Sequence, residues 1–128
     1  MLVVEDDSQE GFKGMSAVCV LLFFSFTHQQ EEYPYKQLQY PCALVEWFKK
    51  VGDSPDPKTG MWIVKLEYHQ QWQVISVVHI DSLYRCTHLL PVFGHRPIPR
   101  RFHFSHSMDA FEAFYVNKYA DHHANEIL

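Results

Sequence analysis

The chain has 128 residues, a length that suits one domain with a single buried core. Hydrophobic residues make up 47% of it and aromatic residues 16%, a composition that excludes a largely disordered chain. The formal net charge of -4 argues against a dedicated nucleic-acid-binding domain, although it leaves room for a local basic strip.

Residues 1–14 are expected to form a flexible, acidic N-terminal segment, in which a brief "LVV" could pair as an edge strand. Apolar runs bounded by turn residues then predict strands over residues 16–28, 42–48, 61–68, 74–80 and 87–94. The first of these runs contains "VCVLLFFSF", which is too short to span a bilayer and follows acidic residues, unlike a signal peptide. We read this run as a buried strand and expect no membrane association.

The connections between the predicted strands are rich in proline and polar residues. Residues 29–41, "QQEEYPYKQLQYP", are read as a polar connector. In the loop over residues 49–60, Asp53 and Asp56 can close Asx turns and Gly60 can take a positive φ. Pro91 limits the fifth strand to an edge or bulged position, because proline cannot donate to the hydrogen-bond ladder.

One C-terminal helix is predicted over approximately residues 107–124, with Ser107 as its N-cap and Asp109 in its first turn. Its aromatic stripe has helical spacing and comprises Phe111, Phe114, Tyr115 and Tyr119. The predicted fold is therefore mostly β with a C-terminal α-helix. It is a small antiparallel β-barrel or rolled sheet of about five strands, SH3- or BAH-like in general shape, in which residues 15–128 form one domain capped by the helix.

The end of the chain, "KYADHHANEIL", brings an Asp, two adjacent histidines and a Glu together as a weak metal-site candidate. His122 and His123 lie four and three positions before Glu126, so each could share a helical face with it. Adjacent residues point about 100° apart on a helix, however, which makes it difficult for both histidines to bind one ion. The alternative is a helix C-terminus whose histidines interact with the last carbonyl groups.

A second weak metal candidate is the pair His79 and Asp81 in "VISVVHIDS", which project from the same strand face. An apolar strand that ends in Asp and Ser also looks like the opening strand of an RNase H-type nuclease, where that Asp holds a metal. The residues after Asp81 are too few for the rest of such a core. The alternative is an Asp that caps the turn into "SLYR".

The main concentration of positive charge is in "HRPIPRRFHF", where Arg96, Arg100 and Arg101 are joined by His103. If the phenylalanines of this run face inward, Arg101 and His103 face the solvent together and could bind a phosphate backbone or an acidic peptide. The alternative is a solvated edge that balances nearby acidic residues. Trp72, in a polar turn, is a further candidate contact residue.

Signatures of nucleophilic catalysis and of cofactor binding are missing from the sequence. No serine lies in a G-x-S-x-G elbow, and the five glycines form no phosphate-binding loop, so no cofactor is expected. Cys19, Cys42 and Cys86 form no CxxC pair, which leaves neither a zinc ribbon nor a thioredoxin-like motif. Their apolar surroundings predict unreactive free thiols in a reduced, intracellular protein.

Five segments in this order resemble a known family: "LLFFSF", "YPCALVEWF", "VGDSPDPKTGMWIV", "SVVHIDSLYRCTHLLPVFG" and "SMDAFEAFYVNKYADHHANEI". The resemblance covers approximately residues 14–128. It is to a C-terminal segment of large proteins encoded by Plavaka-type, CACTA-like DNA transposons of mushroom-forming fungi, which are often associated with KDZ transposase genes. The resemblance implies an upstream nuclease core related to RNase H that this chain does not contain. It supplies no catalytic residues for this segment.

The sequence and the resemblance together favour a non-catalytic accessory or binding module, located in the nucleus. The expected partners are DNA, chromatin or another part of the parent transposase. Two alternatives remain open. One is a fragment of a metal-dependent nuclease or hydrolase that uses the two weak metal candidates, and the other is a transposon remnant without function.

Overall fold

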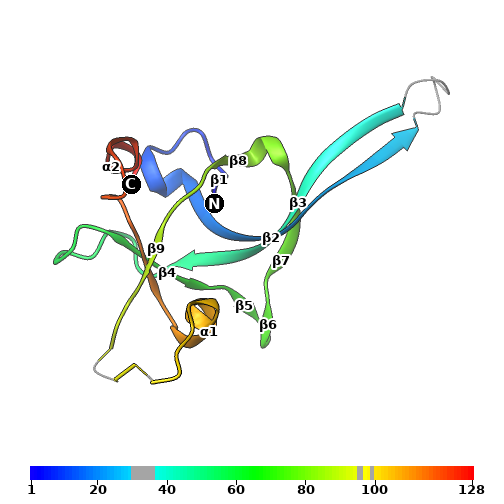
Figure 1. Cartoon of the computed structure of the whole chain (residues 1–128). Helices are drawn as coiled ribbons and strands as arrows, with labels where there is room; N and C mark the ends of the chain where they lie inside the picture. The colour runs from blue at the N-terminus through cyan, green and yellow to red at the C-terminus, as the bar shows by residue number, and fades with distance from the viewer. Residues whose placement is uncertain (30–36, 95–96, 99) are drawn as a thin grey trace.

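The computed structural model describes residues 1–29, 37–94, 97–98 and 100–128 (Figure 1). Its strands are β1 (Leu2–Val4), β2 (Met15–Gln29), β3 (Gln37–Lys50), β4 (Trp62–Leu66), β5 (Tyr68–His69), β6 (Trp72–Gln73), β7 (Ile75–His79), β8 (Leu83–Arg85), β9 (Leu89–Pro91) and β10 (Phe114–Val116). The α-helices are α1 (Ser107–Ala110) and α2 (His122–Ile127), and the 3-10 turns are η1 (Gly11–Gly14), η2 (Ile80–Ser82) and η3 (Phe104–His106).

Most of the strands belong to one 8-stranded antiparallel sheet with the order β8-β1-β2-β3-β4-β10-β9. β7 also pairs with β3, over residues 42–46, whereas β4 pairs with β3 farther along, over residues 48–50. The sheet therefore branches at β3 and does not close into a barrel. The prediction of a mostly antiparallel β fold with a small C-terminal helix is confirmed.

The two faces of the β2–β3 ladder contribute to two different hydrophobic cores. Neighbouring residues on a strand point to opposite faces, so Ala17 and Val18 enter different cores. Val18 and Val45 pack in the smaller core with Val3 and Ala43. The larger core, on the other face, contains Leu2, Phe12, Ala17, Phe48, Trp62, Val64, Phe114 and Val116.

The N-terminal segment is part of the body of the fold, so the prediction of a flexible segment over residues 1–14 is wrong. β1 lies between β2 and β8 and is not an edge strand. Leu2 and Phe12 are almost completely buried. Gly14 ends the turn η1 at a close approach, because an added Cβ there would lie 2.3 Å from the carbonyl oxygen of Asp6. Apolar residues on either side of the acidic stretch anchor the segment to the sheet.

The β2–β3 hairpin is longer than predicted. β3 begins at Gln37, so residues 37–41 of the predicted polar connector are strand, and residues 30–36 lie outside the described part of the chain. Beyond the pairing of β3 with β7, no third strand among the described residues pairs with residues 25–28 or 38–41. We call these two stretches the arm, and Figure 1 shows it projecting from the body.

The predicted Asx turn at Asp56, the positive φ of Gly60 and the edge position of Pro91 are confirmed. Asp56 accepts hydrogen bonds from the backbone N–H and the hydroxyl of Thr59, and Gly60 has a φ of 69°. β9, which contains Pro91, pairs with β10 and lies at the end of the strand order, so the predicted edge position is confirmed. Lys49 and Lys50 still belong to β3, and the loop begins after them.

The single helix predicted over residues 107–124 is wrong, because the structure places two short helices and a strand there. Phe114 and Val116 are buried and Tyr115 is half-buried between β4 and β9, which is the alternation of a strand. Aromatic and β-branched residues favour strands, and pairing on both sides outweighs the helical spacing. Asn117 accepts a hydrogen bond from the N–H of Tyr119 and turns the chain toward α2.

We expect the larger core to depend on Phe114, which is 1% exposed and packs edge-on against Phe48 at a centroid distance of 6.0 Å. Phe114→Ala should lower the free energy of unfolding by about 3–5 kcal/mol, because it leaves a cavity. Phe104→Ala is the matched control, since Phe104 is 79% exposed and its removal should cost less than about 0.5 kcal/mol. Urea unfolding followed by tryptophan fluorescence measures both. Equal losses in the two variants would contradict this packing.

Candidate functional site

Asp121, His122 and His123, in the polar cluster near the end of the chain, lie at the start of helix α2. Asp121 is the N-cap of α2, and its carboxylate accepts a hydrogen bond of 2.7 Å from the backbone N–H of Ala124. His122 and His123 therefore lie in the first helical turn, far from the last carbonyl groups with which they were predicted to interact. The alternative prediction, a helix C-terminus formed by these histidines, is therefore wrong.

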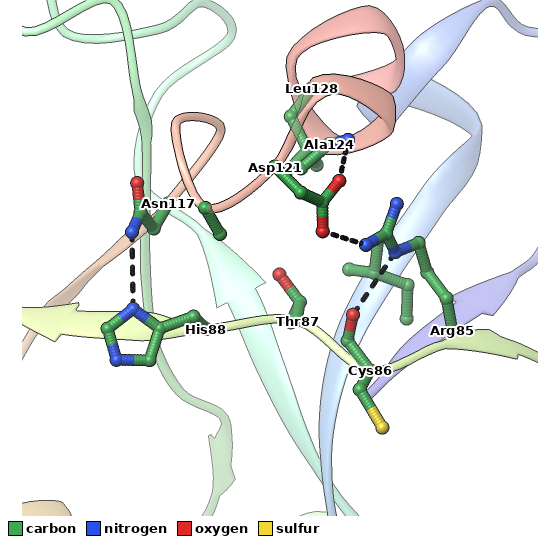
Figure 2. Close-up of a pocket in the computed structure, with 10 residues that line it drawn as sticks. Arg85, Cys86, Thr87, His88, Asn117, Asp121, Ala124 and Leu128 are labelled. Carbon is green, nitrogen blue, oxygen red and sulfur yellow. Dashed lines mark hydrogen bonds and ion pairs between the residues drawn. The ribbon is translucent and has the colours of Figure 1, made fainter.

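Arg85, on β8, connects this cap to the sheet (Figure 2). One guanidinium nitrogen donates to the Asp121 carboxylate at 2.6 Å, and another contacts Nδ1 of His123 at 2.9 Å. Because a guanidinium only donates, Nδ1 of His123 accepts here, and Nε2 faces the hydroxyl of Tyr84 at 3.2 Å. The hydrogen bond from Ala124, together with Arg85, holds the pKa of Asp121 below its usual value. This network fixes α2 against β8.

A cavity of about 270 Å³ lies beside this network (Figure 2). Its wall includes Cys86, His88 and Asn117 as well as the Arg85–Asp121 pair. Nδ1 of His88 lies 3.2 Å from the amide nitrogen of Asn117. The polar groups of the wall thus contact one another, an arrangement that orders the chain.

The weak metal candidates do not come together in the described part of the chain. His122 extends into solvent, with Nε2 3.6 Å from a Glu126 oxygen, while His123 turns toward Arg85, so the predicted divergence of the two histidines is confirmed. His79 ends β7 and Asp81 lies in η2, whereas His122 and Glu126 lie on α2. Among the described residues, no group of three or more His, Cys, Asp or Glu side chains is placed to hold a metal ion.

At β7, the structure reverses the predicted capping role. Nδ1 of His79 accepts a hydrogen bond from the N–H of Asp81 and caps η2, so the cap is His79 and not Asp81. Asp81 itself is largely exposed. The pair therefore shapes the corner between β7 and β8.

The basic strip is exposed, but it is not a strand. Arg100, Arg101 and His103 are exposed in a turn, whereas Arg96 lies outside the described residues. Phe104 is 79% exposed, so it does not meet the condition that the phenylalanines of this run face inward. Nδ1 of His103 lies 2.8 Å from the hydroxyl of Ser105. Trp72 is exposed as predicted, at the tip of the small hairpin formed by β5 and β6.

The largest departure from prediction is an uncovered apolar surface on the long hairpin. Directly paired residues share a face of a sheet, so Leu22, Leu44 and Val77 lie side by side on β2, β3 and β7. This surface, which we call the bare face, comprises Leu22, Phe24, Phe26, Tyr40, Leu44, Ile75 and Val77. Leu22 is 54% exposed and Val77 53% exposed, so the run read as a buried strand is buried only at its beginning.

Composition gave one signal for this surface. A continuous apolar run such as "VCVLLFFSF" is typical of a strand that is covered on both faces. In the structure, β4 pairs with β3 beside Phe48, Phe114 of β10 packs against Phe48, and the larger core does not extend to Leu44. Cys19 borders the covered end, and burial raises the pKa of its thiol, so it stays protonated.

No family model matches the chain, and no curated protein or solved structure matches it either. None of the described helices is long and apolar enough to cross a membrane.

We expect the docking of α2 to weaken in acid because of Asp121. The folded-state pKa of Asp121 lies below its unfolded value of about 3.9, so its contribution to stability is complete above that pH. The contribution is lost as the pH falls through the folded-state pKa. The protection factor of the Ala124 amide, which is its intrinsic hydrogen-exchange rate divided by the observed rate, should therefore fall in acid. Asp121→Asn should remove most of this pH dependence. An unchanged acid profile in Asp121→Asn would contradict the assignment.

Proposed function

We propose that the chain is a non-catalytic binding module of a transposon-encoded protein and that its partner is a protein docked on the bare face. The observation that carries this proposal is the exposure of Phe26, Val77 and their neighbours on one continuous sheet face. The largest contiguous apolar patch on a monomeric protein typically measures about 300–600 Å² and is often a functional site. The resemblance to the transposon segment supplies the nuclear setting and the parent transposase as a source of partners.

The polar groups of the fold give less support to catalysis. Arg85, Asp121 and His123 are engaged with one another, and the candidate metal residues are divided between β7 and α2. A catalytic site needs a nucleophile or base with free lone pairs beside a space for substrate. Cys86 and His88 both line the cavity next to α2, but the thiol of Cys86 contacts the sulfur of Met1 and Nδ1 of His88 contacts the side chain of Asn117.

DNA binding through Arg100, Arg101 and His103 is the second candidate, favoured by the exposure of these side chains. Two cationic side chains in a turn neutralise few phosphates, and phosphate contacts supply most of the affinity for DNA. The net charge of -4 also opposes association with DNA. A protein partner therefore has the stronger support.

The SH3- or BAH-like shape belongs to this proposal. The strand order β8-β1-β2-β3-β7 supports it, because the 3-10 turn η2 joins β7 to β8, which are the two ends of this order. The smaller core, around Val18 and Val45, would be the interior of that barrel. The bare face lies on its outer side.

A fluorescent apolar dye and a labelled random-sequence DNA duplex test the two candidates on the purified chain at low protein concentration. We expect the dye to bind, and the double variant Leu22→Ser/Val77→Ser to lose most of the fluorescence gain, because it removes the centre of the bare face. Arg100→Glu/Arg101→Glu is the control and should leave dye binding unchanged.

The DNA duplex should bind weakly, if at all, in low salt. Tight DNA binding that falls with added salt and disappears in Arg100→Glu/Arg101→Glu would overturn the preference for a protein partner. Dye binding that is equal in the wild type and in Leu22→Ser/Val77→Ser would show that the bare face is not an accessible apolar site. Circular dichroism of each variant checks that it is folded.

A further inference from the structure

We propose that the bare face is covered by the bare face of a second copy of this chain, so that the module works as a symmetric dimer. This inference rests on the proposed function, because it assigns an occupant to the same surface. It starts from the arm, residues 25–28 and 38–41, which no third described strand pairs with.

The arm needs a partner for its apolar side chains. A hairpin of only two strands is at best marginally stable in water unless a hydrophobic face packs on something. Phe26 and Tyr40 stack on each other at a centroid distance of 5.2 Å, but Phe26 is still 50% exposed. Stacking within the arm therefore leaves half of the ring in water.

The bare face continues the larger core. On the same face of the ladder, Phe48 is buried against Phe114 of β10, and Leu44 follows it after Glu46. A second sheet laid on the bare face would extend this apolar packing along the hairpin. Sheets pack in this way at a separation of about 10 Å, with their strands nearly aligned.

Charge selects an antiparallel arrangement of the two copies. Glu46 lies on this face at the end near the body, and its half-buried carboxylate has no ion-pair partner in the part of the chain that the structure describes. His28 lies on the same face at the far end, opposite Leu38. A twofold axis across the strands places Glu46 of one copy against His28 of the other. The same axis sets the aromatic end of one face against the aliphatic end of the other.

The area suits a weak dimer. Strand spacing and rise give each face a length of about 20 Å and a width of roughly 10–14 Å, so the pleated surface exposes on the order of 400 Å². Two copies would bury about 800 Å², which is in the range of weak, transient interfaces. We therefore expect a dimer that dissociates on dilution through the micromolar range.

Sedimentation velocity over a concentration series tests the dimer, with two phenylalanines of similar exposure as a matched pair. Phe26, on the bare face, is 50% exposed, and Phe23, on the opposite face, is 57% exposed. Phe26→Ser should weaken the dimer about tenfold or more, as expected of a buried interface aromatic. Phe23→Ser should leave it unchanged.

A wild-type chain that stays monomeric at every concentration overturns the inference, as does equal weakening by Phe23→Ser and Phe26→Ser. If the wild type stays monomeric and still binds the apolar dye on the bare face, the second copy is the wrong occupant but the proposed function stands. If dye binding fails as well, both fall.

A charge exchange tests the antiparallel arrangement. Glu46→Lys and His28→Glu should each weaken the dimer, because Glu46→Lys removes the acceptor for the imidazole N–H of His28 and His28→Glu places two carboxylates across the interface. The double variant Glu46→Lys/His28→Glu should recover the wild-type affinity. Additive weakening in the double variant would overturn the antiparallel arrangement.

Discussion

The β2–β3 ladder is the constraint on which the rest of the fold depends. Its two strands of 15 and 14 residues are shared by both hydrophobic cores, because successive side chains face opposite sides of the sheet. β1, β4 and β7 all attach to this ladder, and β8 and β10 attach through them. A one-residue slip of one strand would move its side chains from one core to the other. The register in which Val18 pairs with Trp47 therefore determines which residues enter each core.

The same ladder explains where a partner can bind. It is longer than the layers that cover it, so its inner part is enclosed and its outer part presents apolar side chains to water. Polar side chains of the fold are used elsewhere and for another purpose, since Arg85 and Asp121 hold α2 on β8. The geometry thus separates a stabilising polar network from an apolar docking surface. That separation is the reason for assigning a binding function and not a catalytic one.

Strand positions were predictable where prolines and glycines bound an apolar run, as between Gly60 and Tyr68, and Pro91 revealed an edge strand. The segment after residue 107 was not predictable, since Phe114 and Tyr115 fit a helical stripe and a strand equally, and only pairing with β4 and β9 decides between them. The ion pair of Arg85 with Asp121 was not predictable from the sequence, because the two residues lie 36 positions apart. The bare face escaped notice because an apolar run indicates burial without showing how far a covering layer extends.

Amide hydrogen exchange along β2 and β3, in dilute solution, tests the central claim most directly. If both cores clamp the inner half of the ladder, amides of residues 17–20 and 43–48 should exchange only through global unfolding, with one common free energy. Amides of residues 25–28 and 38–40 should exchange much faster, through local opening of the arm. Uniform protection along the hairpin, or different opening free energies on the two faces of its inner half, would contradict the account.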